Sequence, residues 1–97
     1  MTIKGYDAFL ECLSSERVHY LFGNPGTTEL AIMEALGKQS NIEYILGLQE
    51  SIVVAMADGY ARASGKLAVA NVHVVPGLGN AMGSIFIAIF FLSLTHI

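Results

Sequence analysis

The sequence has little charge and few residues suited to cross-linking or metal binding: 13% of its residues are charged, one is cysteine, two are proline and none is tryptophan. A single cysteine excludes an internal disulfide and a zinc site made of several thiolates. Five Lys and Arg residues against eight Asp and Glu residues give a net charge of −3, so no basic surface for nucleic acid is expected. Charged residues interrupt the N-terminal segment, which does not fit a secretory signal, and a cytosolic location is expected.

Apolar side chains are abundant instead, at 54% of 97 residues. This length allows one small domain with a modest core, so part of the apolar surface is expected to be covered by something else. Cys12 lies between Leu10 and Leu13 and is expected in the core. The apolar run 85–94 predicts a helix that needs cover and does not span a membrane, since spanning takes roughly 20 apolar residues.

Segments typical of strands alternate with segments typical of helices along the chain. Strands are predicted at 18–22, 42–46 and 67–75. The predicted helices are one over about 3–15 capped by Thr2, one capped by Thr27 or Thr28 with Leu30, Met33 and Leu36 buried, one over 50–64 ended by Gly65, and one capped by Asn80. This alternation predicts an α/β fold: a parallel sheet of repeated βα units with right-handed crossovers and helices on both faces.

Three loops follow the three predicted strands, at 23–26, 47–49 and 75–79. In a parallel sheet, the carboxyl ends of the strands meet at one edge, and ligands bind there. This topology would bring four polar residues towards a shared crevice: Asn24, Thr27, Glu50 and His73. The strand order, which could still separate them, is left open.

Two of these residues each have a structural and a functional interpretation. Glu50 in the first turn of a helix could simply complement the helix dipole. Its neighbours in sequence are apolar, however, and an apolar setting favours a protonated or proton-sharing carboxyl. His73 could be an ordinary strand-end residue, or it could perform acid–base chemistry at the carboxyl end of its strand.

The glycine loops do not fit nucleotide motifs. Gly77-Leu78-Gly79 begins a dinucleotide pattern, but Met82 occupies the position of its third glycine. The loop 23–27 lacks the lysine of a phosphate-binding loop. No pair of His or Glu residues has metal-ligand spacing. Nicotinamide binding and nucleotide hydrolysis are therefore not expected.

Four blocks together resemble a known family. They are Phe22-Gly23-Asn24-Pro25-Gly26-Thr27-Thr28-Glu29-Leu30, then Leu48-Gln49-Glu50, then Ala57-Asp58-Gly59-Tyr60-Ala61-Arg62, and then Asn71-Val72-His73 with 76–83. In this order they resemble the N-terminal, pyrimidine-binding domain of thiamine diphosphate-dependent enzymes, over about 3–84. The nearest branch is the benzoylformate decarboxylase-like 2-oxo acid decarboxylases, and acetolactate synthases are the close alternative. Residues 85–97 then form a divergent apolar tail.

The resemblance implies roles for individual residues. In this family, the glutamate matching Glu50 bonds N1′ of the cofactor's aminopyrimidine and shares a proton with it, and the cofactor serves as the electron sink for decarboxylation. Thr27 matches a serine that faces the substrate, and His73 matches a histidine proposed for proton transfer, which acetolactate synthases lack. The remaining cofactor-binding positions implied are Asn24, Pro25, Gly26, Pro76 and Gly77.

The resemblance also implies parts that this sequence does not contain. Family members bind the diphosphate and Mg²⁺ through a separate domain with a Gly-Asp-Gly motif, and the complete site spans two subunits of a homo-oligomer. The chain is therefore expected to be a fragment that is inactive alone, with no metal site of its own. The alternatives are a fragment of an acetolactate synthase-like carboligase, a non-catalytic binding domain, and a small membrane-associated protein that uses the tail.

Overall fold

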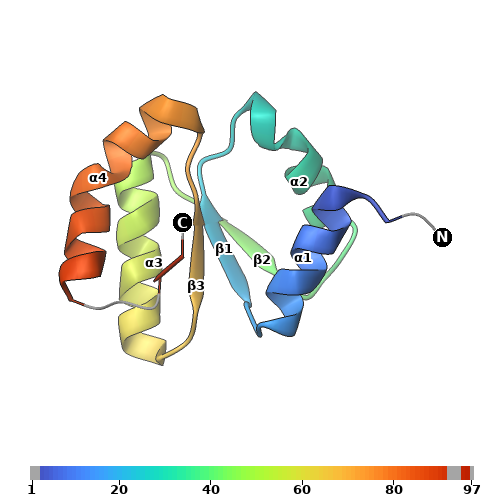
Figure 1. Ribbon diagram of the computed structural model, residues 1–97, viewed down its shortest axis with the longest axis horizontal. Coiled ribbons are helices and arrows are strands. Elements are labelled where there is room, and N and C mark those ends of the chain that lie inside the picture. Colours follow the sequence, from blue (N-terminus) through green and yellow to red (C-terminus); the bar gives the residue numbers. More distant parts are fainter. Residues whose placement is uncertain (1–2, 92–94, 97) are drawn as a thin grey trace.

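The computed structural model describes residues 3–91 and 95–96. Two helices precede and two follow the middle of the chain, around a sheet of short strands (Figure 1). The described helices are α1 Gly5–Ser15, the 3-10 turn η1 Thr27–Glu29, α2 Leu30–Leu36, α3 Glu50–Ser64 and α4 Val74–Phe90. The described strands are β1 Tyr20–Gly23, β2 Glu43–Leu46, β3 Ala68–Asn71 and β4 Thr95–His96.

The described strands form one parallel sheet in the order β2-β1-β3-β4. β1 lies between its two neighbours, with Leu21 paired to Tyr44 of β2 and to Val69 of β3. The predicted α/β class with a parallel sheet is confirmed. Because all three predicted strands run in the same direction, β1, β2 and β3 end at the same edge of the sheet, as predicted.

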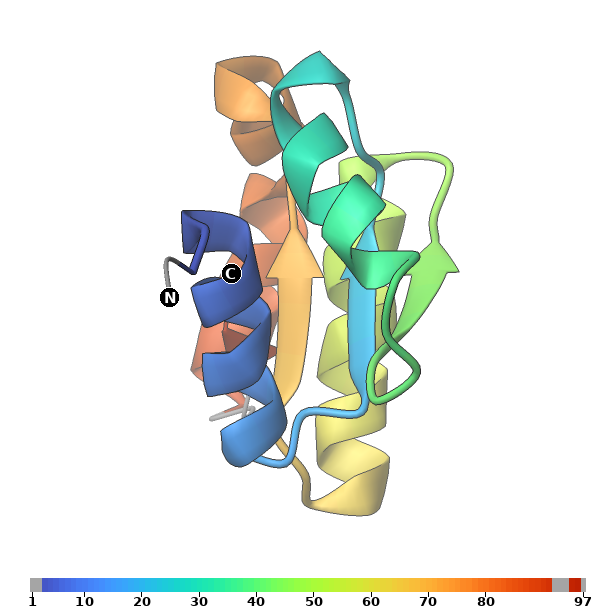
Figure 2. The same cartoon turned by 90° about the vertical axis from the view of Figure 1, so that its right-hand side faces the viewer.

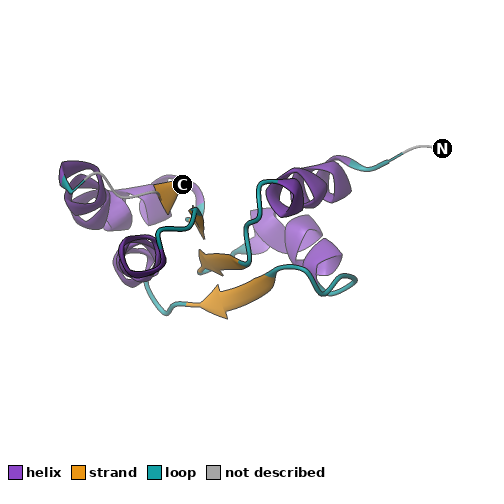
Figure 3. Ribbon diagram, turned by 90° about the horizontal axis from the view of Figure 1, so that it is seen from below, coloured by secondary structure: helices purple, strands orange, loops and turns teal. Residues whose placement is uncertain are grey.

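Helices cover both faces of the sheet, which is seen along its strands in Figure 3. α1 and α2 lie on one face, towards the viewer in Figure 2, and α3 and α4 on the other. Successive strand residues point to opposite faces. Leu21 and Val69 therefore join the core under α1 and α2, while Phe22, Ala68 and Ala70 join the core under α3 and α4.

α3 and α4 pack closely because small residues line their contact. Ala57 and Ala81 are fully buried there, and the Ser84 hydroxyl donates to the Ser51 carbonyl oxygen at 2.8 Å. The predicted pair on α3 is also present, with Arg62 Nε 3.0 Å from Asp58 Oδ1. Gly65 ends α3 in a left-handed conformation, with φ 69°. The predicted bounds of this helix are confirmed at both ends.

The predicted bounds around β3 and α4 are wrong. β3 ends at Asn71, and α4 already begins at Val74. The predicted loop 75–79 therefore lies inside the helix, and Asn80 is an interior residue and not its cap. The physical reason is that Pro76 lies in the first turn of α4, where a helix does not need its missing N–H group.

The helices on the other face bury less than their patterns predicted. In α1, Leu10 is buried, but Phe9 is 43% exposed and Cys12, expected in the core, is exposed. In α2, Leu36 is buried while Leu30 of the predicted stripe is 61% exposed. Each helix contacts the sheet through a narrow face, so the side chains next to that face remain exposed. The cap predicted at Thr2 lies outside the described residues, and α1 begins after Lys4.

The end of α4 carries an uncovered apolar surface. The predicted helix 85–94 is helical as far as Phe90, and residues 92–94 lie outside the described part. Exposed side chains on this segment are Met82, Phe86, Ile87, Ile89, Phe90 and Phe91. The predicted boundary after residue 84 falls inside α4. Within residues 3–91 and 95–96, no helix combines the length and apolar character needed to cross a membrane.

Candidate functional site

The loop after β2 fixes the start of α3 and with it the position of Glu50. Gly47 packs so closely on Val53 that a Cβ there would lie 2.6 Å from Val53 Cγ2, which requires glycine. The Gln49 side-chain oxygen then accepts from the Ser51 backbone N–H at 2.6 Å and caps the helix. Glu50 follows as the first residue of α3, at the edge of the sheet where the strands end.

Glu50 is a buried carboxylate without a hydrogen-bond donor from the described chain. It is 7% exposed, and no group of residues 3–91 or 95–96 donates to its side-chain oxygens. α4 covers it through Gly77, where a Cβ would lie 2.7 Å from Glu50 Oε2. Glycine at this position thus leaves room for the carboxylate. A buried carboxylate is costly unless it is paired, so this one is suited to a partner outside the chain.

Only part of the apolar sequence expected around Glu50 is buried. Leu46, Leu48 and Ile52 are 59%, 85% and 50% exposed. Val53 lies at the buried face of α3, and Gly77 of α4 closes over the carboxylate. The apolar surroundings predicted for Glu50 are therefore supplied in part by α4, a helix more than twenty residues further along the chain.

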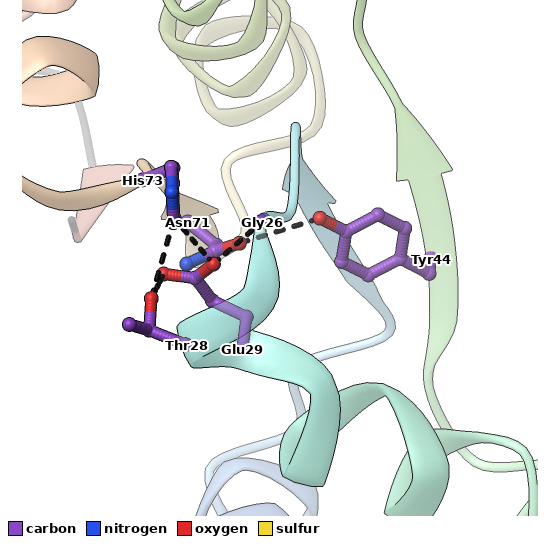
Figure 4. A network of polar contacts seen from close by, with 6 residues as sticks. All are labelled: Gly26, Thr28, Glu29, Tyr44, Asn71 and His73. Carbon is purple, nitrogen blue, oxygen red and sulfur yellow. Dashed lines mark hydrogen bonds and ion pairs between the residues drawn. The ribbon is translucent and has the colours of Figure 1, made fainter.

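A second buried carboxylate, Glu29, lies at the same edge and is fully engaged (Figure 4). Its Oε2 accepts from the Gly26 backbone N–H at 2.7 Å, and its Oε1 accepts from the Thr28 hydroxyl at 2.7 Å. His73 Nδ1, which comes from the loop after β3, lies 2.8 Å from Oε2. The Glu29 carboxylate thus connects η1, the loop before it and the loop after β3.

These contacts set the protonation of Glu29. Burial alone would raise the pKa of its carboxyl, but the hydrogen bonds from Thr28, Gly26 and His73 outweigh that and lower the pKa. Tyr44 lies on the far side of Glu29, and burial together with this negative charge raises the pKa of its phenol to about 12. Its hydroxyl donates weakly to Asn71 Oδ1 at 3.4 Å. At neutral pH, Glu29 is ionised and Tyr44 is neutral.

Glu29 was missed as a site residue, and the threonine caps predicted beside it are wrong. Neither Thr27 nor Thr28 caps a helical segment, because both lie inside η1, whose cap position is Gly26, and α2 follows Glu29. A glutamate at this spacing from the start of a helix is the signal that could have identified it. Gly26 also has to be glycine, since a Cβ there would lie 2.2–2.4 Å from three atoms of the His73 ring.

The structure divides the predicted site residues into groups. Gly26 and His73 lie together around Glu29, whereas Glu50 and Gly77 form a separate contact. Of the other predicted residues, Asn24 and Pro25 are half-buried, and Thr27 and Pro76 are exposed.

Val74, next to His73, adopts φ 49°, a left-handed conformation that β-branched residues avoid. Such strain is kept where the surrounding contacts fix the backbone.

A cavity of about 740 Å³ lies beside Glu29, between α1, α2 and β3. Phe9, Ile32 and Met33 contribute to its apolar wall, and Tyr44 and Asn71 contribute polar groups. Glu50 lies outside it. The cavity therefore lies on the face of the sheet that α1 and α2 cover only in part, and it is not the space in front of Glu50. In the part of the chain that the structure describes, no three His, Cys, Asp or Glu residues gather as metal ligands.

Comparison with known proteins identifies the family of the chain. The family model described as thiamine pyrophosphate enzyme, N-terminal TPP binding domain, matches residues 3–89. The chain belongs to this family. The predicted resemblance to the pyrimidine-binding domain of thiamine diphosphate-dependent enzymes is therefore confirmed.

Individual relatives of this thiamine pyrophosphate enzyme domain include both predicted branches. Benzoylformate decarboxylase of Pseudomonas aeruginosa is 42% identical over 80 residues, which are 82% of this chain and 15% of that protein. The acetolactate synthase large subunit of Haemophilus influenzae is 40% identical over 86 residues, 89% of this chain and 15% of that protein. The crystal structure of benzoylformate decarboxylase from Polynucleobacter necessarius matches with TM-score 0.86 and 33% identity, over 96% of this chain and 17% of that one. The chain thus spans about 15% of the length of the curated relatives it matches.

Proposed function

We propose that this chain supplies the aminopyrimidine-binding part of a thiamine diphosphate-dependent 2-oxo acid decarboxylase. The observation that carries the proposal is Glu50, a carboxylate 7% exposed with no donor from the described residues. Gly77 packs directly beside its Oε2, where a Cβ would lie 2.7 Å away. An ionisable ring nitrogen or amine that reaches the carboxylate would give it the partner it lacks.

The residues present fit the pyrimidine end of the cofactor. Glu50 would hold a proton between its carboxylate and the ring, and Gly77, which has no side chain, would leave the carboxylate room beside α4. Asn24, Pro25, Gly26 and Pro76 would form the surrounding wall. Thiamine diphosphate, when bound, supplies the electron sink that decarboxylation of a 2-oxo acid requires. We propose that the diphosphate and Mg²⁺ are held by a separate domain of a homo-oligomeric enzyme located in the cytoplasm.

His73 favours the decarboxylase branch over the acetolactate synthase-like branch. Glu29 holds its ring at the end of β3, next to the strained Val74, and such a fixed imidazole suits proton transfer to or from a substrate. Thr27, which is exposed on η1, would offer its hydroxyl to the substrate. The second candidate is an acetolactate synthase-like carboligase, favoured by the 40% identity to that enzyme. A non-catalytic domain with the same fold is the third.

A chimeric enzyme tests the proposal. Residues of this chain would replace the matching 80-residue segment of the Pseudomonas aeruginosa benzoylformate decarboxylase. We expect decarboxylation of a 2-oxo acid by the chimera, and a loss of about 10²–10⁴-fold in kcat for Glu50→Gln, because an amide cannot share a proton with a ring nitrogen. Glu34→Gln, which changes an exposed carboxylate of α2, is the matched control.

Three results would contradict the proposal. Near-normal turnover of the Glu50→Gln chimera would return Glu50 to a residue that only complements the helix dipole. Acetolactate formation from pyruvate in place of net decarboxylation would favour the carboligase. The 97-residue chain alone should show no binding of thiamine diphosphate by isothermal titration, since the charged end of the cofactor has no partner here. Tight Mg²⁺-dependent binding by the lone chain would refute the proposal that a separate domain holds the diphosphate and Mg²⁺.

A further inference from the structure

We propose that Glu29 is a positioning residue that fixes the tautomer and orientation of His73, so that Nε2 is the nitrogen left for proton transfer. This inference rests on the proposed function for its consequence in catalysis. Its structural part rests on the contacts of the chain itself. The two residues are 44 positions apart and meet because β1 and β3 are neighbours in the sheet, with Gly23 paired to Asn71.

The hydrogen-bond roles around Nδ1 follow from counting protons. Thr28 has one hydroxyl proton, and Glu29 Oε1 accepts it at 2.7 Å. The same hydroxyl oxygen lies 3.2 Å from His73 Nδ1, so towards the ring it can only accept. Glu29 Oε2, at 2.8 Å from Nδ1, is likewise an acceptor when the carboxyl is ionised. Both partners of Nδ1 are acceptors, and Nδ1 must therefore carry the proton.

This assignment leaves Nε2 unprotonated in the neutral ring. The hydrogen bond made by one ring nitrogen decides which tautomer is present, and the other nitrogen is then available as a base or, once protonated, as an acid. Hydrogen bonds from Gly26 and Thr28 keep Glu29 ionised against the effect of burial, so the acceptor stays an acceptor through the neutral pH range. Burial disfavours the charged form of the Glu29 carboxyl and the hydrogen-bond donors favour it, and the effect of the donors is the larger.

Gly26 fixes the ring from a second direction. The imidazole packs against this residue so closely that a Cβ would lie 2.2–2.4 Å from its Nδ1, Cε1 and Nε2 atoms. The N–H of Gly26 also donates to the oxygen that Nδ1 contacts. Loop, carboxylate and ring therefore close one continuous set of contacts (Figure 4), and the ring, whose side chain is 31% exposed, cannot rotate without breaking it.

The first test measures the tautomer directly on the 97-residue chain. ¹⁵N chemical shifts of the His73 ring, recorded above the pH at which it is protonated, distinguish Nδ1–H from Nε2–H. We expect the Nδ1–H form in the wild type. Glu29→Ala should shift the ring towards Nε2–H, and Thr28→Val should shift it less, because Oε2 remains. Glu34→Gln should leave the spectrum unchanged. A wild-type ring in the Nε2–H form, or an unchanged tautomer in Glu29→Ala, overturns the proposal.

The second test reads the consequence in the chimeric enzyme and serves also if Glu29→Ala fails to fold. Glu29→Gln keeps the size of the side chain, and we expect it to lower kcat about 10–100-fold with KM for thiamine diphosphate unchanged. If Glu29 acts through His73, Glu29→Gln combined with His73→Ala should be no slower than His73→Ala alone. Losses that multiply, or a raised KM with unchanged kcat, overturn the proposal. A wild-type chimera without activity would instead refute the proposed function, and the tautomer measurement would still decide the role of Glu29.

Discussion

Two buried carboxylates lie at the same edge of the sheet, yet their surroundings differ. Glu29 is 9% exposed and Glu50 is 7% exposed, so they lose water to a similar extent. Glu29 accepts from a backbone N–H, a hydroxyl and an imidazole. Glu50 receives no hydrogen bond from the described residues and packs against the backbone of Gly77.

The difference fits the positioning role that we propose for Glu29 and the ligand-binding role that we propose for Glu50. A buried charge lowers stability unless hydrogen bonds or an opposite charge offset its loss of water. The chain offsets that cost for Glu29 with its own groups. Glu50 has no such partner among the described residues, which is expected of a site whose partner comes from outside. Burial by itself therefore does not tell which of the two residues binds a ligand; the hydrogen-bond partners do.

The largest expected effect comes from breaking the contacts of Glu29 while those of Glu50 stay intact. Gly26→Ala would place a Cβ within 2.4 Å of the His73 ring. The ring must move and leave Glu29, so we expect the free energy of unfolding to fall by about 1–3 kcal/mol, as for other overpacked sites. Urea unfolding at one protein concentration measures it.

Gly59→Ala is the matched control for this substitution. Gly59 lies on α3, and a Cβ there would meet nothing within 4 Å. Alanine should raise stability there by about 0.5–1 kcal/mol through its better helix propensity. If Gly26→Ala were as stable as the wild type, the close packing of His73 on Gly26 would not hold in solution.

Glutamine substitutions of the two carboxylates should change stability in opposite directions and so sharpen the comparison. Glu29→Gln should lower the free energy of unfolding by about 1–3 kcal/mol, because a buried group then faces donors it cannot satisfy. Glu50→Gln should raise it by about 0.5–2 kcal/mol, since an uncompensated buried charge is removed at a functional position. Urea unfolding of both variants beside the wild type decides the matter. Equal and negative changes would mean that Glu50 has a stabilising partner in the lone chain.

The smallest effect is in the pH dependence of stability. The pKa of Glu29 is lowered in the folded chain from its ordinary value of 4.5 by its hydrogen bonds. Its stabilising contribution is therefore fully present above pH 4.5 and is lost as the pH falls through the lower folded value. The stability difference between the wild type and Glu29→Gln should shrink accordingly at acidic pH, measured by urea unfolding from neutral pH to about pH 3.

The same series with Glu34→Gln provides the reference. Glu34 is exposed and pairs only with Lys38 at 3.4 Å, so its difference from the wild type should stay small throughout. A constant difference for Glu29→Gln across the range would show that its carboxylate is not held in the ionised form by its partners.

Much of the architecture could be predicted because it depends on local pattern. The apolar runs before Gly23 and Gly47, the turn at Gly65 and the small residues of α3 are all visible along the chain. The start of α4 was not, because Pro76, Gly77 and Gly79 have low intrinsic helix preference. They are nevertheless helical in the folded chain, where Gly77 packs on the Glu50 side chain.

The sequence by itself determined the α/β order of elements and the position of Glu50 at the end of a strand, since strand and helix periodicity and the breaking residues act within a few positions. It also carried the motif blocks that indicate the family. Only the tertiary structure decided that Glu29 binds His73 and that Gly77 covers Glu50. Those contacts join residues dozens of positions apart, and they exist because β1 pairs with β2 on one side and with β3 on the other. The order of strands in a sheet is set by packing over the whole chain, which no local pattern encodes.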